Sequence, residues 1–149
     1  MLASFKFIQK LWLLHSKILA KINLKEKIDN EESLSKFTNQ LIHKITENLE
    51  KFHYNVIVAN LHEMYNFLIK EIEKPIDSTI LKENYKKILT IMMPFIPHLA
   101  NECMENITND RATWPRIISD QLLEENINFV VQINGKKRAL LNVKRDITE

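Results

Sequence analysis

The sequence predicts a mainly α-helical chain, an antiparallel helix bundle followed by a short β-hairpin. Over most of residues 1–107, apolar side chains recur at spacings of three and four, which is the helical period. The chain has a single glycine, which disfavours folds with many tight turns and excludes a glycine-rich phosphate loop. That glycine follows an asparagine between two apolar, β-branched runs, a pattern typical of a two-residue hairpin turn.

The composition is that of one globular domain without chemistry of its own. The chain has 149 residues, of which 45% are hydrophobic and 27% charged. Its lone cysteine, Cys103, excludes a disulfide framework and a cysteine zinc site, and we expect it to be a small core residue. The five histidines lack metal-ligand spacing, and no apolar run reaches about 18 residues. We therefore expect no catalytic residue, no metal site and no contact with a membrane.

The first predicted helix covers residues 3–22 and contains no acidic residue. Its predicted apolar stripe consists of Phe5, Ile8, Trp12, His15, Leu19 and Ile22. At 100° per residue, four lysines fall within about 60° of one another. They are Lys6, Lys10, Lys17 and Lys21. This basic ridge predicts contact with phosphate groups, and the alternative is an ordinary solvated helix face.

Three further long helices are expected at residues 32–51, at 55–74, and from Asp77 or Ser78 up to Pro94. Asn55 is the predicted N-cap of the middle one. Pro97 suits the first position of a short fifth helix, because the proline ring presets a helical φ. The predicted apolar face of the helix at 32–51 consists of Leu34, Phe37, Leu41, Ile45, Leu49 and Phe52. That of the helix at 55–74 consists of Ile57, Leu61, Met64, Tyr65, Leu68 and Ile72. That of the next helix consists of Leu81, Tyr85, Ile88, Leu89 and Met92.

These elements predict three regions. Residues 1–107 form the bundle, residues 108–126 form a linker with a short helical turn, and residues 127–149 hold the hairpin and the start of a truncated C-terminal domain. In the hairpin, residues 129–133 and 136–143 are the strands, and Asn134-Gly135 is a type I′ turn. Trp12, Phe95 and Trp114 are interpreted as core or docking residues rather than as platforms for stacked bases.

Charge is distributed unevenly along the chain. Residues 1–25 carry +5, residues 26–135 carry −6, and residues 136–149 carry +3, for a net charge of +2. Two basic ends around an acidic middle indicate a polyanionic partner that touches the ends. The candidate contacts at the second end are Lys136, Lys137 and Arg138.

Four segments, in this order, resemble a known family. Residues 52–61 are similar to its F-N-T-A-I-S-A-L, residues 89–102 to L-L-A-P-F-A-P-H-I-A-E-E, residues 114–115 to W-P, and residues 130–138 to V-V-Q-V-N-G-K-V-R. The resemblance is to the C-terminal part of class I aminoacyl-tRNA synthetases, and the last segment points to leucyl-tRNA synthetase. The sequence departs from the family at Cys103-Met104, where Leu-Trp is usual, and only approximately follows it at residues 117–121.

The resemblance implies a fragment known in the family as the anticodon-binding domain, without the HIGH and KMSKS signatures, the editing domain or the zinc loop. The parent enzyme it implies ligates leucine to its tRNA with ATP, and with metal ions, and hydrolyses mischarged tRNA. The fragment itself has no cofactor and no active site. Its implied partners are the tRNA for leucine, held by its body through phosphate contacts, and the remaining domains of the parent, in a cytoplasmic monomer.

Two alternatives remain open on the sequence. The first is a non-catalytic helical module that binds a partner helix through its apolar stripes. It accounts for the periodicity but not for the basic hairpin. The second is the same domain of a valyl-, isoleucyl- or methionyl-tRNA synthetase, against which the hairpin segment argues.

Overall fold

The computed structural model describes residues 2–27, 32–118, 126–133 and 136–144. The chain divides into two compact units, Met1–Ile117 and Ile118–Glu149. In the described residues, the first unit contains helices only and the second contains two strands.

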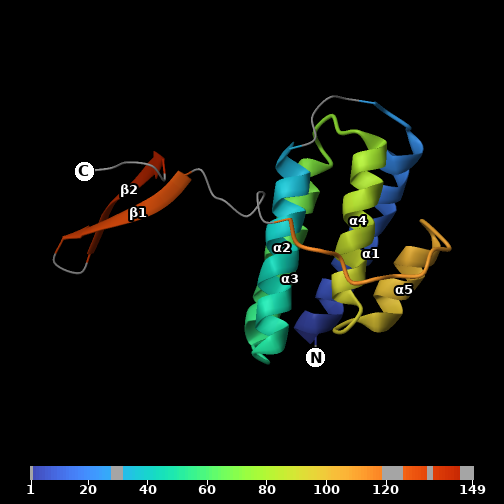
Figure 1. The fold of residues 1–149 in the computed structure, drawn as a ribbon, viewed down its shortest axis with the longest axis horizontal. Helices are drawn as coiled ribbons and strands as arrows, with labels where there is room; N and C mark the ends of the chain where they lie inside the picture. The colour runs from blue at the N-terminus through green and yellow to red at the C-terminus, as the bar shows by residue number, and fades with distance from the viewer. Residues whose placement is uncertain (1, 28–31, 119–125, 134–135, 145–149) are drawn as a thin grey trace. The chain divides into compact units, whose positions relative to one another are not determined.

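The first unit is a bundle of four long helices and one short one (Figure 1). They are α1 (Leu2–Asn23), α2 (Glu32–Glu50), α3 (Tyr54–Glu71), α4 (Ser78–Met92) and α5 (Pro97–Glu105). Consecutive long helices run in opposite directions, and α4 packs on α1, α2 and α5. The predicted antiparallel bundle is therefore confirmed.

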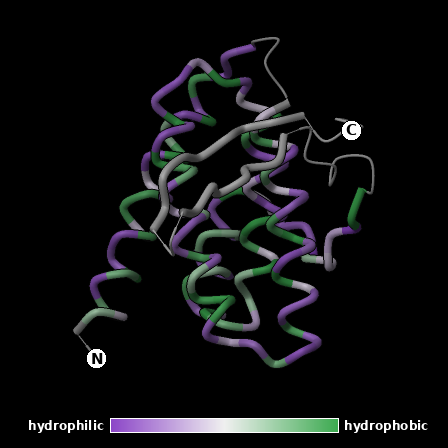
Figure 2. Tube along the Cα trace, turned by 90° about the vertical axis from the view of Figure 1, so that its left-hand side faces the viewer, coloured by the Kyte–Doolittle hydropathy of each residue, from purple (hydrophilic) through white to green (hydrophobic). Residues whose placement is uncertain are grey.

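The core forms where one face of each helix turns inward, and hydrophobic residues recur along each helix of the bundle (Figure 2). Ile57, Leu61, Met64 and Leu68 of α3 are buried, as their spacing predicts. In α4 the whole predicted face is buried, and Cys103 of α5 is a core residue as expected. Other fully buried side chains are Ile18, Leu41, Ile42, Ile45, Leu81, Ile88, Leu89 and Ile91.

The predicted apolar stripe of α1 is only partly confirmed: His15 is buried and Ile22 packs against the core, but the first half of the stripe is exposed. Phe5 is 59% exposed and Trp12 is 41% exposed, whereas Leu11, Leu14 and Ile18 are buried. This helix has more apolar residues than one stripe can bury, so two stripes satisfy the helical period. Packing against the neighbouring helices decides between them. Phe52, predicted to continue the apolar face of the second helix, lies beyond the end of α2 and is 73% exposed.

The helix ends follow the predicted signals in α4 and α5 but not in α3. The carboxylate of Asp77 accepts hydrogen bonds from the backbone N–H groups of Thr79 (2.8 Å) and Ile80 (3.1 Å), which confirms an N-cap at the start of α4. Pro97 occupies the first turn of α5, as predicted. Asn55 is not the cap of α3, because that helix already begins at Tyr54.

The second unit contains strands β1 (Asn126–Ile133) and β2 (Lys136–Lys144), which pair antiparallel. Val131 pairs with Ala139, but Gln132 pairs with Lys137, so the register shifts by one residue. Arg138 lies at this irregularity, which the sequence analysis did not predict. The predicted turn at residues 134–135 lies outside the described residues, and the complete hairpin therefore stays a prediction.

Candidate nucleic-acid interface

The basic ridge of α1 is the best-described part of the candidate interface. Lys6, Lys10 and Lys17 are exposed, and within the described part of the chain none of the three forms an ion pair. The fourth member differs, because the Lys21 ammonium lies 3.6 Å from a Glu26 carboxylate oxygen and its side chain is only 20% exposed. The ridge therefore presents three cations that no acidic side chain of the described ranges neutralises, and a fourth that is partly neutralised.

Free ammonium groups of this kind suit phosphate contacts. An exposed lysine loses little hydration when it approaches a phosphate, and the contact releases counterions from the nucleic acid. Lysine acts as a point charge and needs no particular base, so such contacts position a polyanion without reading its sequence. Other lysines of the bundle are engaged, since Lys44 lies 3.3 Å from Glu63 and Lys74 lies 2.8 Å from Glu71.

The second predicted cluster starts strand β2. Lys136 pairs with Ile133 and Lys137 pairs with Gln132, and Arg138 follows at the register shift. Only the backbone of these three residues is described. They belong to the second unit, whereas the ridge belongs to the first, so each cluster stands as a separate candidate.

A polar cluster inside the bundle is structural. His15 Nδ1 lies 3.2 Å from the Tyr85 hydroxyl oxygen, and the Cys103 thiol is close enough to the same hydroxyl for the two groups to affect each other's pKa. Burial lowers the pKa of His15, raises the pKa of Tyr85, and raises the pKa of Cys103 to about 11. All three groups are therefore neutral near pH 7, and all three are buried away from any substrate.

The aromatic residues singled out from the sequence have different roles. The Trp114 indole N–H donates a hydrogen bond to the Thr46 hydroxyl (3.1 Å), which docks the segment after α5 onto α2. Phe95 is half-buried and its ring lies 6.4 Å from that of Tyr54. Trp12 is largely exposed beside an apolar groove, lined by Ile8, Gln9, Trp12, Leu13 and Leu99, and is not a core residue.

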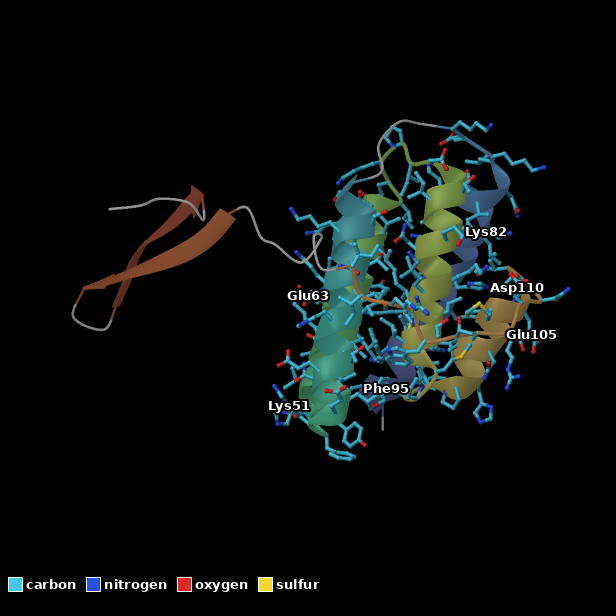
Figure 3. All side chains as sticks on the ribbon, in the orientation of Figure 1. Lys51, Glu63, Lys82, Phe95, Glu105 and Asp110 are labelled. Carbon is cyan, nitrogen blue, oxygen red and sulfur yellow. The ribbon has the colours of Figure 1, made fainter. Side chains whose placement is uncertain are left out.

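Cationic side chains that the sequence analysis missed gather at another place. Lys25 and Lys27 follow α1, and Lys82 and Lys86 lie on α4, yet all four line one pocket. Figure 3 shows Lys82 on the same side of the bundle as Asp110, which lines this pocket too. The spacing of four between Lys82 and Lys86 was a visible signal, but only the fold brings the end of α1 to the start of α4.

The described residues offer neither a metal site nor a membrane-spanning helix. No group of three or more histidine, cysteine, aspartate or glutamate side chains in this part of the chain could hold a metal ion. None of the helices in the described ranges is long and apolar enough to cross a bilayer.

Comparison with known proteins agrees with a nucleic-acid-binding domain. Residues 31–149 match the family model described as the anticodon-binding domain of tRNA ligase. The chain is 32% identical to the leucine–tRNA ligase of Petrotoga mobilis over 98% of its own length, and 32% identical to that of Thermosipho melanesiensis over 97%. It spans about one fifth of each of these curated relatives, 20% and 19% respectively.

A solved structure has the same fold. It is the ternary complex of the Agrobacterium radiobacter K84 agnB2 LeuRS with tRNA and LeuAMS, which is 24% identical in sequence and superimposes with a TM-score of 0.75. The similarity covers 99% of this chain and 20% of that one. Together with the family model, which covers most of the residues, these findings establish that the chain belongs to the anticodon-binding domain family of tRNA ligases.

Proposed function

We propose that this chain is the tRNA-binding part of a leucine–tRNA ligase, and that it holds the body of the tRNA for leucine. The observation that carries the proposal is similarity over nearly the whole chain to leucine–tRNA ligases, within a family of anticodon-binding domains. The relatives named above are all leucine enzymes, which favours leucine over valine, isoleucine or methionine.

The proposed mode of binding is contact with phosphates rather than with base edges. The exposed, unpaired lysines of α1 support it, because ammonium groups along one helix face can follow an RNA backbone. Lys136, Lys137 and Arg138 of the predicted hairpin form the second proposed contact. The two basic ends then act on one ligand, and specificity for leucine tRNA depends on the rest of the enzyme.

In this proposal the chemistry belongs to the parent enzyme. The parent uses ATP, with metal ions, to ligate leucine to tRNA, and it hydrolyses mischarged tRNA. The present chain contributes the grip on the tRNA and no reacting group. We further propose that the parent is a cytoplasmic monomer.

The remaining domains of the parent are the second proposed partner. The face of α1 opposite the lysines is apolar, exposed and uncharged, and it carries Phe5, Ile8 and Trp12. Apolar side chains gathered on one exposed face favour contact with another protein surface. The same face supports the alternative function, a helical module that binds other proteins and no RNA.

A titration of the whole chain distinguishes these functions. Fluorescently labelled tRNA for leucine and an unrelated tRNA are titrated at low and at moderate salt. We expect salt-sensitive binding of both with a slight preference for leucine tRNA, because phosphate contacts dominate. If the chain is folded, as circular dichroism would show, and binds neither tRNA at low salt, the tRNA-binding function is wrong.

A further inference from the structure

A pocket of about 600 Å³, lined mostly by charged and polar residues, lies where the end of α1 meets the start of α4. Its walls come from three segments: the connection after α1, the first turns of α4, and the residues that follow α5. This volume is within the range of sites that hold small ligands or parts of larger ones. Because three segments build the pocket, its lining is not a property of any one helix.

Hydrogen bonds fix the connection after α1 against α4. The backbone N–H of Ser78 donates to the Glu26 carbonyl (3.0 Å), and the Ser78 hydroxyl donates to the Lys21 carbonyl (3.2 Å). Between those two acceptors, Lys25 has a φ of 52°, in the left-handed region that is unfavourable for residues other than glycine. The backbone that carries Lys25 and Lys27 is thus held beside α4.

Each acidic residue that lines the pocket already lies within ion-pair distance of Lys21 or Lys86. Glu26 lies 3.6 Å from the Lys21 ammonium. The Lys86 ammonium lies 3.1 Å from Asp110 and 4.0 Å from Glu83. These contacts leave Lys25, Lys27 and Lys82, and in the described ranges no acidic side chain lies within ion-pair distance of any of the three. The pKa of the Asp110 carboxyl is lowered by hydrogen bonds from Thr108 and Lys86, and the nearby charge of Lys82 contributes to this shift. Lys82 is half-buried, so its charge is less well hydrated than that of an exposed lysine.

The amide groups at the start of α4 are not the source of the positive character. The Asp77 carboxylate already accepts hydrogen bonds from the backbone N–H groups of Thr79 and Ile80. The lysine side chains are therefore the cationic groups that can hold an anion in the pocket.

We propose that this pocket binds a phosphate group of the RNA backbone through Lys25, Lys27 and Lys82. Each ammonium carries three donors, and the oxygens of a phosphate accept several such bonds at once. Lys25 lies four residues beyond Lys21, so the pocket adjoins the end of the ridge along the chain. The inference rests on the proposed function, and it adds a phosphate site that lies outside the ridge and the hairpin.

A matched pair of variants on α4 tests the pocket. Lys82→Ala removes a pocket cation, and Lys87→Ala removes an exposed lysine of the same helix that does not line the pocket. We expect Lys82→Ala to reduce the slope of log K against log salt by roughly 0.7–0.9 in a tRNA titration, and Lys87→Ala to leave it unchanged. Replacing Lys25, Lys27 and Lys82 together should reduce it by about 2 to 3. Thermal unfolding of each variant shows whether the bundle is intact.

The outcomes separate this inference from the proposed function. If Lys82→Ala matches the wild-type slope while Lys10→Ala lowers it, the pocket proposal is wrong and the tRNA-binding function stands. If the wild-type chain binds no RNA, inorganic phosphate is titrated and followed by amide chemical shifts. Chemical-shift changes confined to the pocket would then mean that the site binds free phosphate, and would overturn the RNA backbone as the source of the bound phosphate group. Absence of shifts would overturn the site altogether.

Discussion

Among single residues, His15 is notable because it belongs to a polar cluster inside an otherwise apolar core. Its ring is 1% exposed, its Nδ1 is bonded to Tyr85, and its Nε2 has no hydrogen-bond partner among the described residues. A charged imidazolium in this position would lose its hydration and gain no anionic partner from that cluster. The folded bundle therefore favours the neutral form of the His15 ring.

The burial of His15 predicts acid sensitivity. Burial holds the pKa of His15 below its ordinary value of 6.5, so below about pH 6.5 the unfolded chain binds more protons than the folded one. Stability contributed by the neutral ring is thus present above that pH and is lost as the pH falls. Tyr85 and Cys103 do not contribute, because burial raises their pKa values and they stay protonated.

Urea unfolding at about pH 7.5 and about pH 5 measures this effect. The midpoint of the wild type should fall between the two values by more than that of His15→Gln, which cannot titrate. His98→Gln serves as the control, since His98 is exposed on α5. Equal pH dependence of the wild type and His15→Gln would contradict the assignment.

The sequence could not decide the burial of residues whose spacing fits more than one packing arrangement of their helix. The buried faces of α3 and α4 could be predicted from their apolar spacing, and a cap at Asp77 or Ser78 could be predicted as well. The cluster around His15 could not, because its three members are far apart in the chain. The pocket lysines were missed for the same reason.

At the scale of elements, α1 has three distinct faces. Leu11, Leu14 and Ile18 face the core, the lysine ridge lies to one side, and an exposed apolar face with Ile8 and Trp12 lies to the other. Apolar periodicity alone could predict the helix but not its rotation. Rotation was fixed by packing, and Phe7 illustrates this with its ring 3.9 Å from that of His62 on α3.

Neighbouring leucines of α1 test that rotation. Leu14 is 2% exposed and Leu13 is 63% exposed. Leu14→Ala should lower the free energy of unfolding by about 2–5 kcal/mol, because it leaves a cavity in the core. Leu13→Ala should change it by less than about 0.5 kcal/mol. Chemical denaturation measures both, and equal losses would mean that the helix is rotated differently.

The start of strand β2 is the second element with a predicted role. The asparagine–glycine pair predicts where the chain turns, but nothing in the sequence predicts the register shift at Arg138. Such an irregularity changes the local twist of a strand, and its position within the basic triplet bears on the proposed contact.

Replacement of Lys136, Lys137 and Arg138 by alanine tests this element. We expect weaker tRNA binding and a salt slope that is smaller by about 2 to 3, because each lost phosphate contact removes roughly 0.7–0.9. The matched control replaces Lys44, Lys51 and Lys74 by alanine and removes the same total charge. In the folded chain these three lysines are paired with Glu63, Glu47 and Glu71 respectively. Identical slopes for both triple variants would assign the effect to net charge alone.

At the scale of the whole molecule, the account is of a helical scaffold that presents cations to a polyanion. The bundle fixes Lys6, Lys10 and Lys17 on one helix, and other lysines are tied up in ion pairs with acidic neighbours. A net charge of only +2 would not distinguish such a protein, and it is the placement of unpaired lysines that supports RNA binding. The bundle and the position of the basic ridge on α1 could be predicted from the sequence. Which lysines form ion pairs could be seen only in the folded structure.

Lysine footprinting tests the central claim most directly. The chain is reductively methylated with and without saturating tRNA for leucine, and modification at each lysine is quantified by mass spectrometry. The account predicts that tRNA protects Lys6, Lys10 and Lys17 and leaves Lys44 and Lys51 as reactive as before. If tRNA is bound and the three ridge lysines react as fast as they do in the free chain, the proposed interface is wrong.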